Sequence, residues 1–90
     1  MVDFKKAVDI AKNHSDENEE LRVAEAYEGN NFYLFALLPE DVEEIDDMPL
    51  SYVDKKTGEY KDVYGPEIGK LINNAEEIPS DEIEAMLMFF

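Results

Sequence analysis

The stretch Phe32-Tyr-Leu-Phe-Ala-Leu-Leu38 decides the fold, because it is an unbroken run of seven apolar and aromatic residues. A run of this length is too short to cross a membrane as a helix, and it is typical of a strand with two buried faces. Such a strand lies in the centre of a sheet, or a helix or another subunit covers its second face. We therefore predict a central strand over residues 31–38.

Turn signals and alternating apolar residues on both sides of this run predict the neighbouring strands. Gly29-Asn30-Asn31 is a turn signal, because Gly and Asn adopt positive φ at low cost, and residues 20–28 before it alternate like a strand. Further along, Asp54-Lys-Lys-Thr-Gly58 has the composition of a tight turn that joins strands over 50–54 and 59–63. Four antiparallel strands are thus expected.

Three helices are expected around this meander. Apolar residues at helical spacing predict a helix over 2–14. Pro66 favours the start of a second helix over 66–75, and Ser80 suits the N-cap of a third over 81–89. A chain of 90 residues is the size of one domain. The predicted fold is α+β, with the N-terminal helix packed on a four-stranded antiparallel meander and one or two C-terminal helices.

Charge is the strongest compositional feature, since 23 Asp and Glu residues against eight Lys and Arg residues give a formal net charge of −15. Such a chain repels nucleic acid and anionic membrane surfaces, so direct binding of either is not expected. A basic protein, such as a toxin or a nucleic-acid-binding protein, is the expected partner, although the acidity could also serve solubility alone. No basic residue follows Lys70, and this last part carries the carboxylates of Glu76, Glu77, Asp81, Glu82 and Glu84, which indicates an acidic face.

The composition also favours a reducing cytoplasm. No cysteine is present, and residues 1–11 carry Lys and Asp where a signal peptide would be apolar.

Few residues with the chemistry of catalysis or cofactor binding are present. The single histidine, His14, lies at the end of the first predicted helix, which indicates a helix-end residue. Three serines have no triad-like context, and four glycines form no phosphate-binding loop. The acidic run 40–47 lacks the ligand spacing and the central glycine of an EF-hand. We therefore expect no enzyme, no cofactor and no dedicated metal site.

Two surfaces are candidates for binding. The first is an acidic loop that steers a basic partner, with tyrosines as anchors; it comprises Glu40, Asp41, Glu43, Glu44, Asp46 and Asp47, with Tyr33, Tyr52, Tyr60 and Tyr64. A nucleic-acid mimic, in which carboxylates are arrayed like phosphates, is an alternative use of this loop. The second surface is the apolar C-terminus, where self-association into a homodimer would use Met86, Met88, Phe89 and Phe90.

Three segments resemble the bacterial immunity protein 35 family. They are Ala7-Val-Asp-Ile-Ala11, Asn31-Phe-Tyr-Leu-Phe35 and Pro49-Leu-Ser-Tyr-Val-Asp-Lys-Lys-Thr-Gly-Glu-Tyr60, and the resemblance spans roughly residues 4–75. It implies a small cytoplasmic domain, encoded beside a toxin, that acts by binding and has the helix-plus-meander fold. A similar hairpin over residues 53–58 occurs in PepSY-type domains and in phage proteins, which stay as alternatives. The leading hypothesis is a non-catalytic immunity or inhibitor protein; the second is a self-associating bacterial or phage domain with a structural role.

Overall fold

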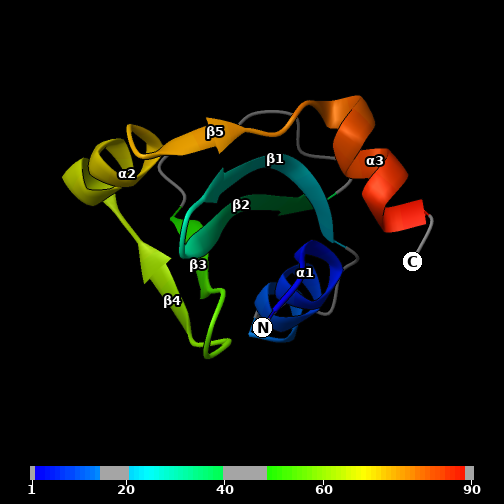
Figure 1. The fold of residues 1–90 in the computed structure, drawn as a ribbon, viewed down its shortest axis with the longest axis horizontal. Coiled ribbons are helices and arrows are strands. Elements are labelled where there is room, and N and C mark those ends of the chain that lie inside the picture. The colour runs from blue at the N-terminus through cyan, green and yellow to red at the C-terminus, as the bar shows by residue number, and fades with distance from the viewer. Residues whose placement is uncertain (1, 15–20, 40–48, 89–90) are drawn as a thin grey trace.

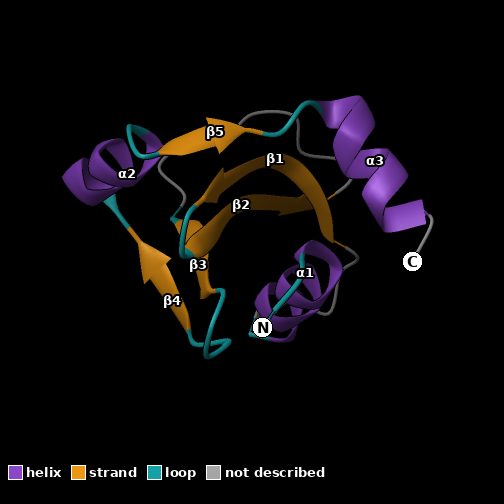
Figure 2. Ribbon diagram, in the orientation of Figure 1, coloured by secondary structure: helices purple, strands orange, loops and turns teal. Residues whose placement is uncertain are grey.

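The computed structural model describes residues 2–14, 21–39 and 49–88, and these residues form an α+β domain (Figure 1). Its helices and strands (Figure 2) are α1 (Phe4–Asn13), β1 (Leu21–Gly29), β2 (Phe32–Pro39), β3 (Leu50–Asp54), β4 (Tyr60–Val63), α2 (Gly65–Ile72), β5 (Ala75–Glu77) and α3 (Ser80–Met88). The predicted fold class is confirmed, with one strand more than expected.

The sheet places β2 in its centre, in the strand order β4-β3-β2-β1-β5. β2 pairs with β1 on one side and with β3 on the other, and every pairing is antiparallel. A register shift between Val23 and Glu25 marks a bulge in β1, and such bulges bend a strand and increase its twist. The sheet curves around α1 (Figure 1). The prediction of a central strand after the Gly29 turn is thus confirmed.

The fifth strand is a correction to the prediction of a helix over 66–75. α2 ends at Ile72, with Asn73 as its C-cap, and the side-chain Nδ2 of Asn74 donates to the carbonyl oxygen of Lys70 over 3.0 Å. The next three residues pair with Tyr27–Gly29 of β1. This short, polar strand has no apolar alternation that would reveal it in the sequence. It is a strand because it forms backbone hydrogen bonds with β1, which is distant in sequence. α3 also begins one residue earlier than predicted, so Ser80 is its first residue.

β2 is apolar throughout because both of its faces are buried. Tyr33 and Phe35 pack with α1, with Ile78 after β5 and with Ile83 of α3. On the other face, Phe32, Leu34 and Ala36 pack with Leu50 and Val63, and the half-buried apolar residues of α2 cover this second cluster. The helix α2 connects the two edge strands, β4 and β5, and so has to cross this face of the sheet.

Both ends of α1 are held by specific contacts. The carboxylate of Asp3 accepts a hydrogen bond from the backbone N–H of Lys6 over 2.8 Å, which caps the first turn. At the other end, the ring of His14 stacks on Tyr60 of β4, with ring centroids 4.4 Å apart and planes 9° from parallel. His14 is therefore a helix-end residue, as predicted, and it also links α1 to an edge strand.

The β3–β4 turn follows the chemistry of its sequence. The carboxylate of Asp54 accepts hydrogen bonds from the backbone N–H groups of Lys56 (2.8 Å) and Thr57 (3.0 Å). These bonds favour the charged form and hold the pKa of Asp54 below its usual value. Gly58 has φ of +76°, a conformation that side-chain-bearing residues rarely adopt.

The buried face of β2 gives a first prediction. Phe35→Ala removes a fully buried ring, so we expect the free energy of unfolding, measured by urea denaturation, to fall by about 3–5 kcal/mol. The matched control is Tyr64→Ala, because Tyr64 is 62% exposed; we expect a change within about 0.5 kcal/mol. Equal losses for the two variants would contradict the burial of Phe35 in the core.

Candidate functional site

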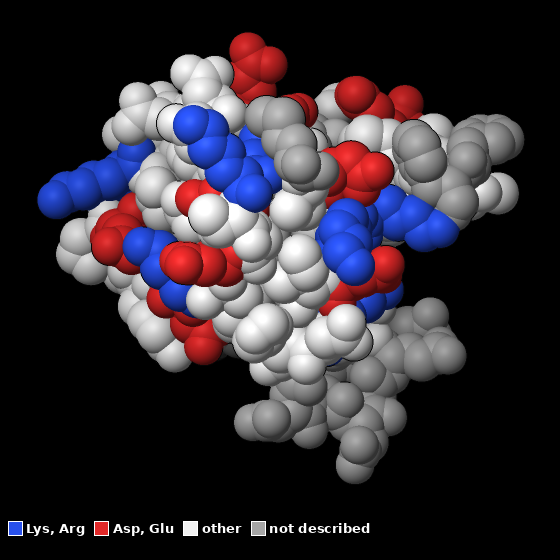
Figure 3. All heavy atoms as spheres, turned by 60° about the horizontal axis from the view of Figure 1, so that its bottom comes forward, with Lys and Arg blue, Asp and Glu red and all other residues white. Residues whose placement is uncertain are grey.

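Acidic and basic residues are distributed unevenly over the fold. All eight basic residues lie in the described ranges, together with 13 of the 23 acidic ones. α1 and the β3–β4 turn carry five of the basic residues, Lys5, Lys6, Lys12, Lys55 and Lys56. On the face drawn in Figure 3, Lys and Arg side chains lie among carboxylates. This part of the surface is electrostatically mixed.

Six of the eight described carboxylates outside the C-terminal part have a local partner. Asp3 caps α1, and Asp54 holds its turn. Four others accept a hydrogen bond or form an ion pair: Glu25 with Tyr27, Glu28 with Lys55, Asp62 with Tyr60, and Glu67 with Lys61. These six carboxylates therefore have structural roles that explain their presence.

The carboxylates of β5 and α3 differ from these six. Glu76, Glu77, Asp81, Glu82 and Glu84, which we call the β5–α3 carboxylates, are all exposed, and residues 71–88 contain no basic side chain. Within the described ranges, none of the five has a hydrogen bond or an ion pair. Asp81 and Glu82 lie in the first turn of α3, where the helix dipole favours negative charge. For the other three, no described contact compensates the charge.

The charge of Glu77 in β5 contributes to the raised pKa of Tyr27 in the neighbouring strand β1. Tyr27 of β1 lies directly opposite Glu77, and its hydroxyl donates to Glu25 over 2.8 Å. Partial burial, this hydrogen bond, and the negative charges of Glu25 and Glu77 raise the pKa of Tyr27 to about 12. Glu77 is the smallest of these causes, so the raised pKa of Tyr27 reflects mainly its burial and Glu25.

The structure separates the tyrosines that the sequence had grouped as anchors. Tyr33 is buried, with its ring edge-on to Phe4 at 5.7 Å between centroids. Tyr52 is half-buried on the opposite face of the sheet, stacked on Phe32 at 5.3 Å. The two rings therefore cannot form one anchor. The acidic loop to which they were assigned, residues 40–47, lies outside the described residues.

The second predicted surface is described only in part. Met86 is half-buried and packs against the core, whereas Met88 is 71% exposed at the end of α3. Phe89 and Phe90 lie outside the described residues.

The β5–α3 carboxylates are not among the site residues predicted from the sequence. Their signal was the lack of any basic residue after Lys70, but only the structure shows that they are exposed and without described partners. No cluster of His, Asp or Glu that could hold a metal ion occurs in the described part of the chain. In the same residues, no helix has the length and apolarity needed to cross a membrane.

Comparison of the chain with protein-family models, with curated proteins and with solved structures gave no significant match. The resemblance to the bacterial immunity protein 35 family therefore stays an expectation, and function has to be argued from the geometry of the surface.

The raised pKa of Tyr27 gives a second prediction. In Glu77→Gln we expect the pKa of Tyr27, measured by NMR or by ultraviolet titration, to fall only slightly from about 12, because burial and Glu25 cause most of the rise and the charge of Glu77 is its smallest cause. A folded-state pKa above the unfolded one stabilises the protein below pH 10, and this contribution is lost as the pH rises through about 12. Glu84→Gln is the control, and an equal shift in both variants would rule out a local effect of β5.

Proposed function

We propose that the protein is a non-catalytic, cytoplasmic protein-binding module of the immunity or inhibitor type, which covers a basic partner with its β5–α3 carboxylates. The observation that carries the proposal is the contrast among carboxylates. Six of the eight described carboxylates elsewhere have a partner, whereas the five on β5 and α3 are all exposed and none of them has a partner within the described residues.

Charge without local compensation has a cost for a domain of this size. Like charges repel one another and destabilise the compact state, and a domain of 90 residues has little stability to spare. A basic partner would remove this repulsion on binding. The same field would steer the partner during its approach, so the association rate should fall with added salt.

Affinity needs anchors besides charge, because exposed ion pairs contribute little by themselves. Met88, at the end of α3, is 71% exposed and has a flexible apolar side chain. It follows Glu84 by four residues in the same helix. The three residues of β5 form one edge of the sheet. The backbone N–H and C=O groups on the outer side of this strand therefore lie beside Glu76 and Glu77.

The net charge and the resemblance to the immunity family favour an inhibitor of a basic protein over a protein that binds nucleic acid directly. A net charge of −15 opposes direct contact with nucleic acid and favours a basic toxin or a nucleic-acid-binding protein. The hairpin over residues 53–58, which carries the resemblance to the immunity family, forms a tight turn between β3 and β4. A nucleic-acid mimic would use the same carboxylates and is a special case of this proposal.

A pair of charge reversals gives the third prediction. We expect Glu77→Lys with Glu84→Lys to abolish capture of a basic protein that the wild type retains from host lysate at low salt and releases at high salt. The control is Asp9→Lys with Glu59→Lys, which changes the net charge equally on the side of α1 and the hairpin. Circular dichroism checks the fold, and mass spectrometry identifies the captured protein.

The control variant decides the outcome. Retention of the same basic protein by wild type and control, with loss in the β5–α3 variant, supports the proposal. Equal capture by all three proteins, or no basic protein retained by the wild type, contradicts it.

A second candidate function is favoured by the exposure of Met88. Self-association through the end of α3 would bury this side chain, and light scattering of the wild type would then give the mass of a dimer. In that case we expect Met88→Lys to restore the monomer, while Glu84→Lys leaves the dimer intact. A wild-type monomer at all concentrations would rule out this candidate.

A further inference from the structure

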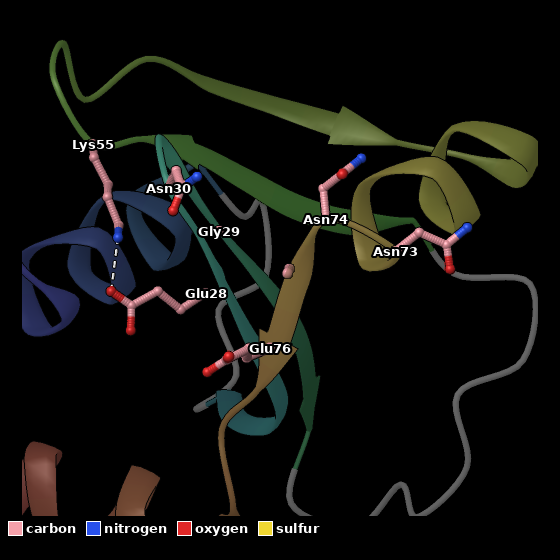
Figure 4. A pocket seen from close by; sticks show the side chains of 8 residues that line it. Glu28, Gly29, Asn30, Lys55, Asn73, Asn74 and Glu76 are labelled. Carbon is pink, nitrogen blue, oxygen red and sulfur yellow. Dashed lines mark hydrogen bonds and ion pairs between the residues drawn. The ribbon is translucent and has the colours of Figure 1, made fainter.

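An open polar pocket of about 480 Å³ lies where β1 ends, beside the turn between α2 and β5 (Figure 4). Gly29 and Ala75 face each other across the two strands at this point. Neither has a long side chain to fill the space, and a Cβ on Gly29 would lie 2.4 Å from the ring of Phe32. The close packing of Phe32 thus leaves no room for a side chain at Gly29.

Two carboxylates of like charge form one wall of the pocket. Glu28 and Glu76 are direct cross-strand partners in the β1–β5 pair, and their side chains lie next to each other in Figure 4. Like charges directly opposite on neighbouring strands destabilise a sheet. A positive charge at this wall would therefore relieve the repulsion between Glu28 and Glu76.

One of the two carboxylates, Glu28, already forms an ion pair within the protein, with Lys55. The Nζ of Lys55 lies 2.7 Å from the carboxylate of Glu28 and 4.8 Å from the centroid of the Tyr33 ring. The side chain of Lys55 is only 12% exposed, and its backbone N–H donates to the carbonyl oxygen of Asn31 over 2.9 Å. Lys55 is thus fixed in place, while Glu76 has no ion pair within the described ranges.

The remaining polar groups are side-chain amides. Asn30 and Asn74 line the pocket from the two turns. The Nδ2 of Asn74 is used by the carbonyl oxygen of Lys70, which leaves the side-chain oxygen of Asn74 to accept a hydrogen bond. With two carboxylates and one lysine, the pocket has a net negative charge and an excess of acceptors.

The charge and the polar groups of the pocket favour one kind of cationic ligand over others. A divalent metal needs several oxygen ligands at once, and the described residues contain no group that could hold one. A quaternary ammonium group is recognised by aromatic rings, and none of the described residues that line this pocket is aromatic. A planar guanidinium group fits best, because its five N–H donors can bind a carboxylate with two hydrogen bonds and reach amide oxygens as well.

We propose that this pocket receives the guanidinium group of an arginine from the basic partner, with Glu76 as its main ligand. The inference rests on the proposed function, since it names one contact of that complex. Small-molecule pockets are enclosed and mostly apolar, whereas this one is open and polar, as suits the tip of a side chain presented by a protein. Arginine in such a position is a frequent source of binding energy.

The test is an NMR titration of the folded chain with N-acetyl-arginine methylamide, with the uncharged citrulline analogue as the matched ligand. We expect saturable shifts of the backbone amides of Gly29, Asn30 and Glu76, with the arginine probe alone. In Glu76→Gln the affinity should fall about five- to tenfold, whereas Glu84→Gln should bind like the wild type. Because Glu76→Gln relieves the repulsion with Glu28, this variant should fold at least as well.

Three results would overturn the inference. They are the absence of pocket shifts, equal shifts with the citrulline analogue, or equal weakening by Glu76→Gln and Glu84→Gln. None of these results bears on the charge-reversal experiment, which tests the proposed function without altering Glu76. Conversely, if the reversals leave capture unchanged while the probe binds the pocket, the proposed function fails and the assignment of the arginine to a basic partner fails with it.

Discussion

The burial of both faces of β2 is the constraint on which the rest of the structure depends. Phe35 and Leu34 are adjacent in sequence, and both are fully buried on opposite faces of the sheet. A single layer of helices cannot cover both, so α1 and α3 take one face and α2 crosses the other. The crossing of α2 delivers the chain to the far edge, where β5 pairs with β1. The position of β5 at the edge of the sheet is therefore a consequence of core burial.

The placement of charge follows from this architecture. Lysines gather on α1 and on the β3–β4 turn, where they lie among carboxylates, and ion pairs such as Lys55–Glu28 form across elements. β5 and α3 come after the last basic residue of the chain, so no neighbour in sequence can compensate their carboxylates. A small domain that tolerates such repulsion has a surface suited to long-range attraction of a basic protein.

Glu76 belongs both to the pocket and to the β5–α3 carboxylates. At the end of the sheet, Gly29 and Ala75 leave a hollow, and the neighbouring pair Glu28–Glu76 gives it charge. In the proposed complex, the exposed carboxylates would steer the partner and the pocket would hold one anchor; a few anchors supply most of the affinity in protein interfaces. The edge strand β5 positions both parts.

The central strand, the hairpin at Asp54 and the helix over α1 could all be predicted from sequence, because each depends on local apolar spacing or turn chemistry. The class of fold followed from these elements. The strand β5 could not be predicted, since three polar residues become a strand only through hydrogen bonds to β1. Tyr33 and Tyr52 are alike in sequence, but the alternation of neighbouring strands places them on opposite faces. The pocket was decided at the tertiary level for the same reason: Glu28, Lys55 and Glu76 are far apart in the chain, and only strand pairing brings them together.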